Sequence, residues 1–201
     1  MKKVGAAIRS GLGGLLRFGG RSSRTDFWIY AIFIVLLASG IWTAIMSMEM
    51  ARTFGEVQQY ADANPGKVTI VTGPNTFSYR IKDGAPGVGP DFGYLIKWIS
   101  GIALAVIALL AAAAVRRLHD SNRTGLWVLL PVPFLFSGLW LMGSLFSEFN
   151  SSTQPNMSML AVGFINNLVY LVTLGFVAFL LLRSGSAGEN RFGVRGTEDV
   201  N

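Results

Sequence analysis

Long apolar stretches constrain this chain more than any other feature of its sequence. Residues 27–48 form a run of 22 without a charge, and residues 92–115, 125–146 and 160–182 are also dominated by apolar side chains. A helix needs about 20 such residues to cross the hydrocarbon core of a bilayer. Only 14% of all residues are charged, against about 25% in soluble domains. The sequence therefore predicts an all-α integral membrane protein with four transmembrane helices.

The polar stretches around these spans predict the remaining parts of the chain. They are a basic amphipathic leader at 1–26, an insert at 49–91, an arginine-rich turn at 116–124, a short loop at 147–159 and a tail at 183–201. Apolar residues of the leader recur every three or four positions, which favours an interfacial helix. Its glycines favour a flexible basic leader instead, so both alternatives stay open. A signal peptide does not fit, because the run at 27–48 exceeds an h-region of about 7–15 residues.

Two local patterns refine these parts. Residues 68–72 and 76–81 are rich in β-formers around Gly73-Pro74-Asn75, which predicts a small β-hairpin over 68–81 within the insert. An isolated two-stranded hairpin is only marginally stable in water, so it needs support from neighbouring elements. Pro131 and Pro133 lie early in the third span and are expected to kink or break it there.

The distribution of basic residues predicts the orientation. The leader, the turn at 116–124 and the tail together hold twelve Lys and Arg residues, whereas the insert and the loop at 147–159 hold four. Positive residues are favoured on the cytoplasmic side of a membrane. We therefore expect both termini in the cytoplasm and the hairpin outside it.

The densest group of charges predicts a binding site. Arg116, Arg117 and Arg123 in the turn, assisted by Arg21 and Arg24, are candidates to bind an anionic lipid headgroup or an acidic partner through guanidinium geometry. The residues expected to orient them are Asp120, His119 and Asp26. On a helix, Asp120 lies three and four residues after Arg117 and Arg116, so one of those ion pairs can form locally. The alternative is that these arginines are membrane anchors and ion pairs that fix helix packing.

Other chemistries find little support. The chain has no cysteine and a single histidine, so we predict no metal site and no cofactor. No nucleotide-binding or hydrolase motif is present, which predicts that the protein is not an enzyme and has no catalytic residues. The basic residues flank apolar runs, so nucleic acid is not an expected partner. Asn166 and Asn167 in the fourth span predict interhelical hydrogen bonds, or less plausibly a pore lining.

Three motifs resemble a known family. Residues 18–28 contain Gly20-Arg21, Arg24 and Asp26-Phe27-Trp28, residues 115–127 contain Arg116-Arg117-Leu118-His119-Asp120 followed by Arg, Gly and Trp, and residues 189–193 read Glu-Asn-Arg-Phe-Gly. Together they are similar to the bacterial inner-membrane family called domain of unknown function 805. The resemblance spans about residues 18–193 and implies a small multi-spanning protein with no established reaction. The insert at 49–91 is longer than this resemblance leads us to expect.

These observations predict a non-enzymatic inner-membrane protein with a cytoplasmic arginine cluster that binds anionic lipid or an acidic partner. One alternative is a transporter or channel subunit that oligomerises around Asn166, Asn167 and the kinked third span. Another is an accessory subunit that docks an unidentified membrane or extracytoplasmic protein through the hairpin at 68–81. Membrane lipids are the expected partners, and a homo-oligomer is compatible with the sequence.

Overall fold

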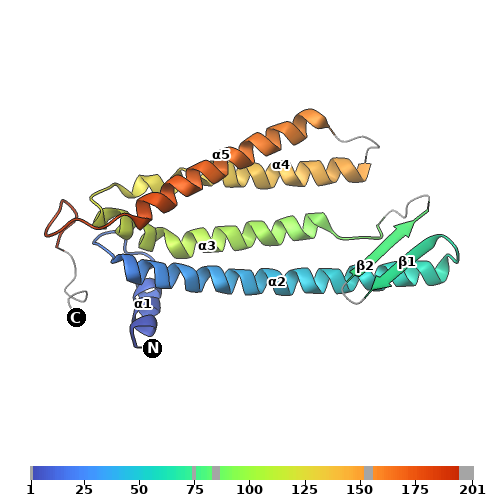
Figure 1. Ribbon diagram of the computed structural model, residues 1–201, viewed down its shortest axis with the longest axis horizontal. Coiled ribbons are helices and arrows are strands. Elements are labelled where there is room, and N and C mark those ends of the chain that lie inside the picture. The colour runs from blue at the N-terminus through green and yellow to red at the C-terminus, as the bar shows by residue number, and fades with distance from the viewer. Residues whose placement is uncertain (1, 74–75, 83–86, 152–155, 195–201) are drawn as a thin grey trace.

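The computed structural model describes residues 2–73, 76–82, 87–151 and 156–194. Figure 1 shows long helices lying side by side, with a small hairpin at one end. The elements are α1 (Lys2–Gly13), α2 (Arg24–Ala63), β1 (Val68–Gly73), β2 (Thr76–Ile81), α3 (Phe92–Asp120), the 3₁₀ helix η1 (Gly125–Leu129), α4 (Val132–Ser151) and α5 (Met157–Leu182). Four helical segments in the described ranges are long and apolar enough to cross a membrane: α2, α3, α4 together with η1, and α5. The predicted helical class with one small hairpin is therefore confirmed.

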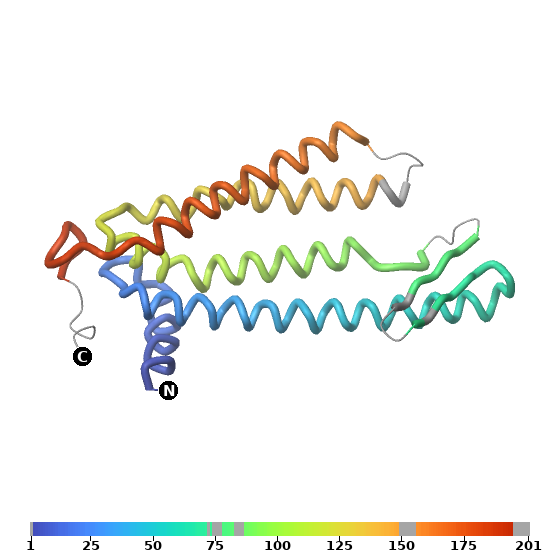
Figure 2. Tube along the Cα trace, in the orientation of Figure 1, coloured from blue at the N-terminus to red at the C-terminus, as the bar shows by residue number. Residues whose placement is uncertain are grey.

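The long helices pack in chain order, α2 on α3, α3 on α4 and α4 on α5, as the tube in Figure 2 also shows. Their buried core gathers at the end where α1 lies and α5 finishes, opposite the hairpin. Phe27, Tyr30, Leu118 and Leu180 are its large members, and Ala113 and Ala114 let α2 approach α3 closely. Tyr30 also donates its hydroxyl to the Leu109 carbonyl at 3.1 Å. This core holds in place the end of the molecule that carries the arginine cluster.

The leader contains a helix, α1, that runs across the ends of the long helices instead of along them (Figure 1). Its buried face consists of small residues, Ala7 and Gly11. A Cβ built on Gly11 would lie 2.4 Å from the Tyr30 ring, so only glycine allows this approach. The apolar side chains of Val4 and Leu12 stay about half exposed. Of the two alternatives left open for the leader, the structure contains the helix, and it ends at Gly13.

Helix α2 is longer than the span predicted at 27–48, because it continues for 15 residues into the polar insert and ends at Ala63. It begins at an N-cap, in which the Ser23 hydroxyl accepts from the Asp26 backbone N–H at 3.1 Å and donates to the Asp26 carboxylate at 2.7 Å. A change from apolar to polar residues marks the end of a span and does not by itself end a helix. The stop signal is Asn64-Pro65-Gly66, where Gly66 has a φ of +80°.

The predicted hairpin is present, with β1 and β2 antiparallel and Val68 paired with Ile81. The turn residues 74 and 75 and the linker residues 83–86 lie outside the described residues. The hairpin lies beside the outer part of α2 (Figure 1), where Thr53 and Val57 are buried. The hairpin therefore forms at the end of the molecule where α2 continues beyond its apolar run.

Two further boundaries differ from the prediction. The arginine-rich turn is shorter, because Arg116 to Asp120 are still helical, and α4 reaches Ser151, which shortens the loop predicted at 147–159. The expected break at the prolines is confirmed, since the 3₁₀ helix η1 precedes Pro131 and α4 starts at Val132. Without N–H groups, these prolines cannot continue the hydrogen-bond ladder of a helix from η1.

Candidate functional site

Asp120, the last residue of α3, is the centre of the candidate site and is completely buried. Its Oδ1 atom accepts from Arg21 Nε at 3.0 Å and from Arg21 Nη2 at 2.9 Å, so two donors from 99 residues away share one oxygen. Its Oδ2 atom accepts from Arg117 Nη1 at 2.5 Å, one turn earlier on the same helix. One carboxylate therefore joins two guanidinium groups, and both of these side chains are buried as well.

Arg117 connects α3 to the end of α5. Its Nε donates to the Leu181 carbonyl at 2.9 Å, and its Nη2 donates to the Arg183 carbonyl. The last carbonyls of a helix have no partner within the helix. Arg117 therefore satisfies the C-terminal end of α5 with a positive charge, which the helix dipole favours there.

Arg21 connects the segment before α2 to the tail. Besides Asp120, it donates to the Ser186 carbonyl at 2.7 Å and to the Gly188 carbonyl at 2.6 Å. The tail comes so close to Asp120 that a Cβ on Gly185 would lie 2.0 Å from the carboxylate oxygen. The Ser186 N–H also donates to the Asp120 backbone carbonyl at 2.8 Å. We call the group formed by Arg21, Arg117 and Asp120 the inner latch.

The inner latch contains two positive charges and one negative charge. The carbonyl ends of α3 and α5 meet there, and each helix end carries the equivalent of about half a negative charge. Together they balance the second guanidinium approximately. The positive and negative charges of the inner latch are therefore approximately balanced within it, and its N–H groups donate to oxygen atoms of the protein.

His119 and the tail form a second layer over the latch. The His119 ring stacks on Phe192 with centroids 3.8 Å apart, and its Nδ1 lies 3.3 Å from the Gly20 carbonyl oxygen. Asn190 Nδ2 donates to the His119 carbonyl at 3.0 Å. Gly193, with a φ of +104°, lets the tail turn back in a short bridge to Asn190. The third sequence motif is therefore the turn that holds the tail on the end of α3.

The turn after α3 depends on Asn122, whose φ of +57° is the only positive value at a non-glycine residue in the described part of the chain. The Asn122 N–H bonds the His119 carbonyl and the Arg123 N–H bonds the Leu118 carbonyl, both at 2.9 Å. This is a Schellman motif, in which asparagine tolerates the left-handed conformation. It reverses the chain directly after Asp120.

The other predicted site residues stay outside the latch. Arg24 is exposed, Arg116 and Arg123 are half-buried, and none of the three has an ion-pair partner among the described residues. Arg116 Nε bonds only to the Ala112 carbonyl of its own helix, at 3.2 Å. Asp26 bonds to Ser23, and it forms no ion pair with an arginine among the residues that the structure describes. The predicted cluster therefore separates into paired arginines and arginines without an acidic partner.

A second polar group lies at the opposite end of the molecule, beyond the apolar run of α2. Glu49 is buried and accepts from Arg52 Nη2 and from the Asp91 backbone N–H, both at 2.6 Å. Arg52 also pairs with Glu56 and donates to the Gly89 carbonyl at 3.1 Å. The hydrogen bond from Arg52 holds the pKa of the Glu49 carboxyl below its usual value against the effect of burial, and the Asp91 N–H assists. We call Glu49, Arg52 and Asp91 the outer clasp, because it fixes the start of α3 to α2.

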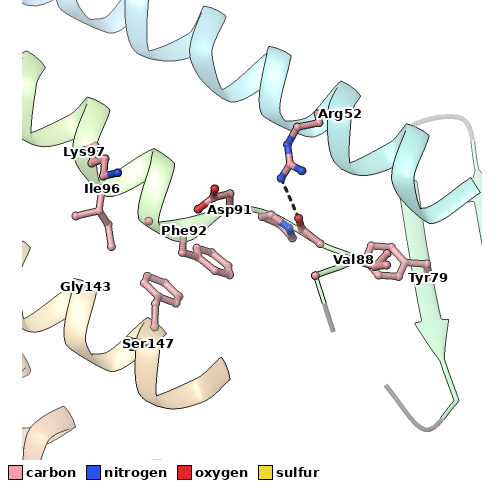
Figure 3. A pocket seen from close by; sticks show the side chains of 14 residues that line it. Arg52, Tyr79, Val88, Asp91, Phe92, Ile96, Lys97, Gly143 and Ser147 are labelled. Atoms are coloured by element: carbon pink, nitrogen blue, oxygen red, sulfur yellow. Dashed lines mark hydrogen bonds between the residues drawn. The ribbon is translucent and has the colours of Figure 1, made fainter. Parts of the chain in front are cut away.

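Beside the outer clasp lies an open cavity of about 770 Å³ between α2, α3 and α4 (Figure 3). Phe92 and Phe146 stack on its wall with centroids 4.0 Å apart, and much of the remaining lining is glycine and apolar side chains. Lys97 lines it without an acidic partner among the described residues, whereas Arg52 is taken by the clasp. The cavity has the volume of a ligand site, and its exposed lysine suits a small anionic group.

The two asparagines of α5 differ in their surroundings. Asn166 Nδ2 donates to the Phe134 carbonyl at 2.9 Å, and Ser137 donates to its Oδ1 at 2.7 Å. The expected interhelical hydrogen bond is confirmed for this residue. Asn167 is exposed and has no hydrogen-bond partner among the described residues.

The sequence did not reveal every residue that builds these groups. Gly185 and Ser186 were missed, and the only signal for them was a run of small residues directly after the last span. Glu49 was also missed, although an acid three residues before Arg52 is the spacing of a helical ion pair. In the described ranges, no cluster of three His, Asp or Glu residues could hold a metal ion.

One comparison with known proteins gives a match. A family model described as "Protein of unknown function (DUF805)" matches residues 15–194, a range that includes the inner latch, the Schellman turn and the Asn190–Gly193 bridge. The resemblance expected from the three motifs is confirmed. No curated protein and no solved structure matches the chain.

Proposed function

The chain belongs to the DUF805 family of unknown function, and we propose that it is a four-span bacterial inner-membrane protein whose cytoplasmic face binds anionic lipid headgroups without catalysing a reaction. The observation that carries this proposal is the contrast between the arginines at this face. Arg21 and Arg117 are consumed by Asp120 and protein carbonyls. Arg24, Arg116 and Arg123 have no acidic partner among the described residues.

The position of these free arginines supports a lipid as their partner. Arg24 directly precedes the apolar run of α2, and Arg116 and Arg123 follow the apolar run of α3. In a helix that spans the membrane, such positions lie at the depth of the lipid headgroups. A guanidinium binds a phosphate through two parallel hydrogen bonds. Each basic residue near an anionic surface contributes about 1 kcal/mol to the attraction.

The position of helix α1 also favours lipid binding at the face that carries the free arginines. It lies across the ends of the long helices, and both apolar residues (Val4, Leu12) and basic residues (Lys2, Arg9) are exposed on it. An amphipathic helix of this kind lies in the plane of the interface, with its apolar side in the acyl boundary and its basic side among headgroups. Gly14, just after α1, packs against the Arg116 guanidinium and so places α1 next to a free arginine.

The test measures lipid retention directly. We expect full-length protein in nanodiscs of phosphatidylcholine with phosphatidylglycerol to retain phosphatidylglycerol in native mass spectrometry. The Arg116→Gln, Arg123→Gln variant should bind it about 30-fold more weakly, since two contacts of about 1 kcal/mol are lost. Retention should also fall as the salt concentration rises.

The matched control removes two charges from the opposite end. Lys67→Gln, Arg80→Gln changes the net charge equally, at exposed residues around the hairpin. We expect it to retain phosphatidylglycerol like the wild type. Equal losses in the two variants would show that only net charge matters, and the arginine site would be rejected.

A further inference from the structure

Helix α5 has one side that no other part of the described chain covers. It packs against α4 and touches α3 only slightly, and it lies at the edge of the helix array in Figure 1. Phe164 is 67% exposed, Leu171 53% and Leu174 40%. Because α5 is apolar on all sides, lipid tails alone could cover such a surface.

Asn167 is the residue on this side that lipid tails cannot satisfy. It is exposed, it has no hydrogen-bond partner among the described residues, and it lies about 4 Å along the axis from the midpoint of α5. An unpaired amide in hydrocarbon is costly, and the bilayer core holds no water to satisfy it. The side chain is also too short to reach the headgroups from this depth.

We propose that Asn167 pairs with the same residue of a second copy, and that α5 is the dimer interface of this protein. Both copies insert in the same orientation, so a two-fold axis along the membrane normal makes the two α5 helices parallel and in register. Each amide has both donors and an acceptor, so the two side chains can bond each other reciprocally. Polar side chains of this kind drive helix association in membranes.

The residues around Asn167 fit this geometry. Leu160, Phe164, Asn167, Leu171 and Leu174 follow one another at spacings of four and three, the seam spacing of paired helices. In a helix that is apolar on all sides, this spacing alone does not indicate which side forms the interface. The Asn167 amide indicates this side. The neighbouring amide, Asn166, is already bonded to α4 and so is not available for a partner. The proposal rests on the membrane insertion proposed above and is independent of lipid binding.

The first test uses the absence of native cysteine. Leu171→Cys places a thiol on the seam, and Val172→Cys places one on a neighbouring residue that is 71% exposed but points about 100° away. After reconstitution of the full chain in phosphatidylcholine vesicles, we expect mild oxidation to cross-link the first variant into a dimer and leave the second monomeric. Equal cross-linking of the two, or none in either, overturns the interface.

The second test removes the amide. Asn167→Leu should weaken dimerisation about 5- to 30-fold, measured by energy transfer between labelled copies as the lipid-to-protein ratio rises. Asn167→Gln keeps an amide and should retain most of the association. A dimer that is unchanged in Asn167→Leu overturns the proposal. Alkaline extraction of the vesicles separates this failure from failed insertion, because an inserted monomer resists extraction and an uninserted chain does not.

Discussion

At the scale of single residues, Asp120 holds two buried guanidinium groups with one carboxylate. Taking charges out of water is costly, and that cost is offset only when every partner is present. The Leu181 and Ser186 carbonyls supply the remaining acceptors. Three chain segments, the residues before α2, the end of α3 and the tail, therefore depend on one side chain.

We expect Asp120→Asn, which keeps the shape and removes the charge, to cost about 3–5 kcal/mol of stability, because two buried cations lose their counter-charge. Thermal unfolding of the full-length protein in detergent measures this, and limited proteolysis should show earlier cleavage of the tail. Asp62→Asn is the control, since Asp62 is exposed and in no ion pair among the described residues. Equal stability of the two variants would contradict the latch.

The sequence identified half of this latch. The spacing predicts that either Arg116 or Arg117 can pair locally with Asp120, and in the structure this partner is Arg117. The pair between Arg21 and Asp120 spans 99 residues, and such a contact depends on how the helices pack, which spacing does not encode. Asp26 was expected among the arginines for its charge, but its position three residues after Ser23 makes it part of a helix cap.

At the scale of elements, α2 shows that the end of an apolar run and the end of a helix need not coincide. Its 40 residues span about 60 Å, twice the hydrocarbon thickness. Hydropathy predicts where the apolar part ends, at Met48, but the helix continues because Asn64-Pro65 is the first strong stop signal. The hairpin was predictable because β-formers around a turn are a local signal. Its position at the same end of the molecule as the outer part of α2 depends on tertiary packing, which the local pattern does not encode.

The outer clasp predicts a dependence on pH. The folded-state pKa of Glu49 is lowered, mainly by its hydrogen bond to Arg52, so the clasp contributes stability above the unfolded pKa and loses it as pH falls through the folded value. We expect hydrogen-exchange protection around Asp91–Leu95 to fall below about pH 4, the region of unperturbed carboxyl pKa values. Protection must be normalised to the intrinsic exchange rate at each pH.

Two variants separate Glu49 from other acids of this region. Glu49→Gln should lower the protection of the same amides already at neutral pH and remove most of its pH dependence. Glu56 pairs with Arg52, whereas the Asp91 N–H bonds to Glu49. The Glu56→Gln variant should therefore leave the protection of these amides near the wild-type value. If Glu56→Gln were the more disruptive variant, the role given to Glu49 would be wrong.

At the scale of the whole molecule, the two polar groups lie at opposite ends of the helix array. The inner latch lies with α1 and the end of α5, and the outer clasp lies with the hairpin (Figure 1). The free arginines gather at the first end, and positive residues are retained on the cytoplasmic side of a membrane. The distribution of charge therefore predicts one common orientation for the four helices.

Single cysteines test this orientation, because the chain contains none of its own. Thr69→Cys in the hairpin and Ala187→Cys in the tail both replace exposed residues. We expect a membrane-impermeant maleimide to label Thr69→Cys in intact bacterial cells with a permeabilised outer layer, and Ala187→Cys only after lysis of the inner membrane. The reverse pattern would place the free arginines on the outer side of the membrane and would contradict the cytoplasmic site proposed for them. Labelling of both positions in intact cells would instead mean that the four helices do not share one orientation across the membrane.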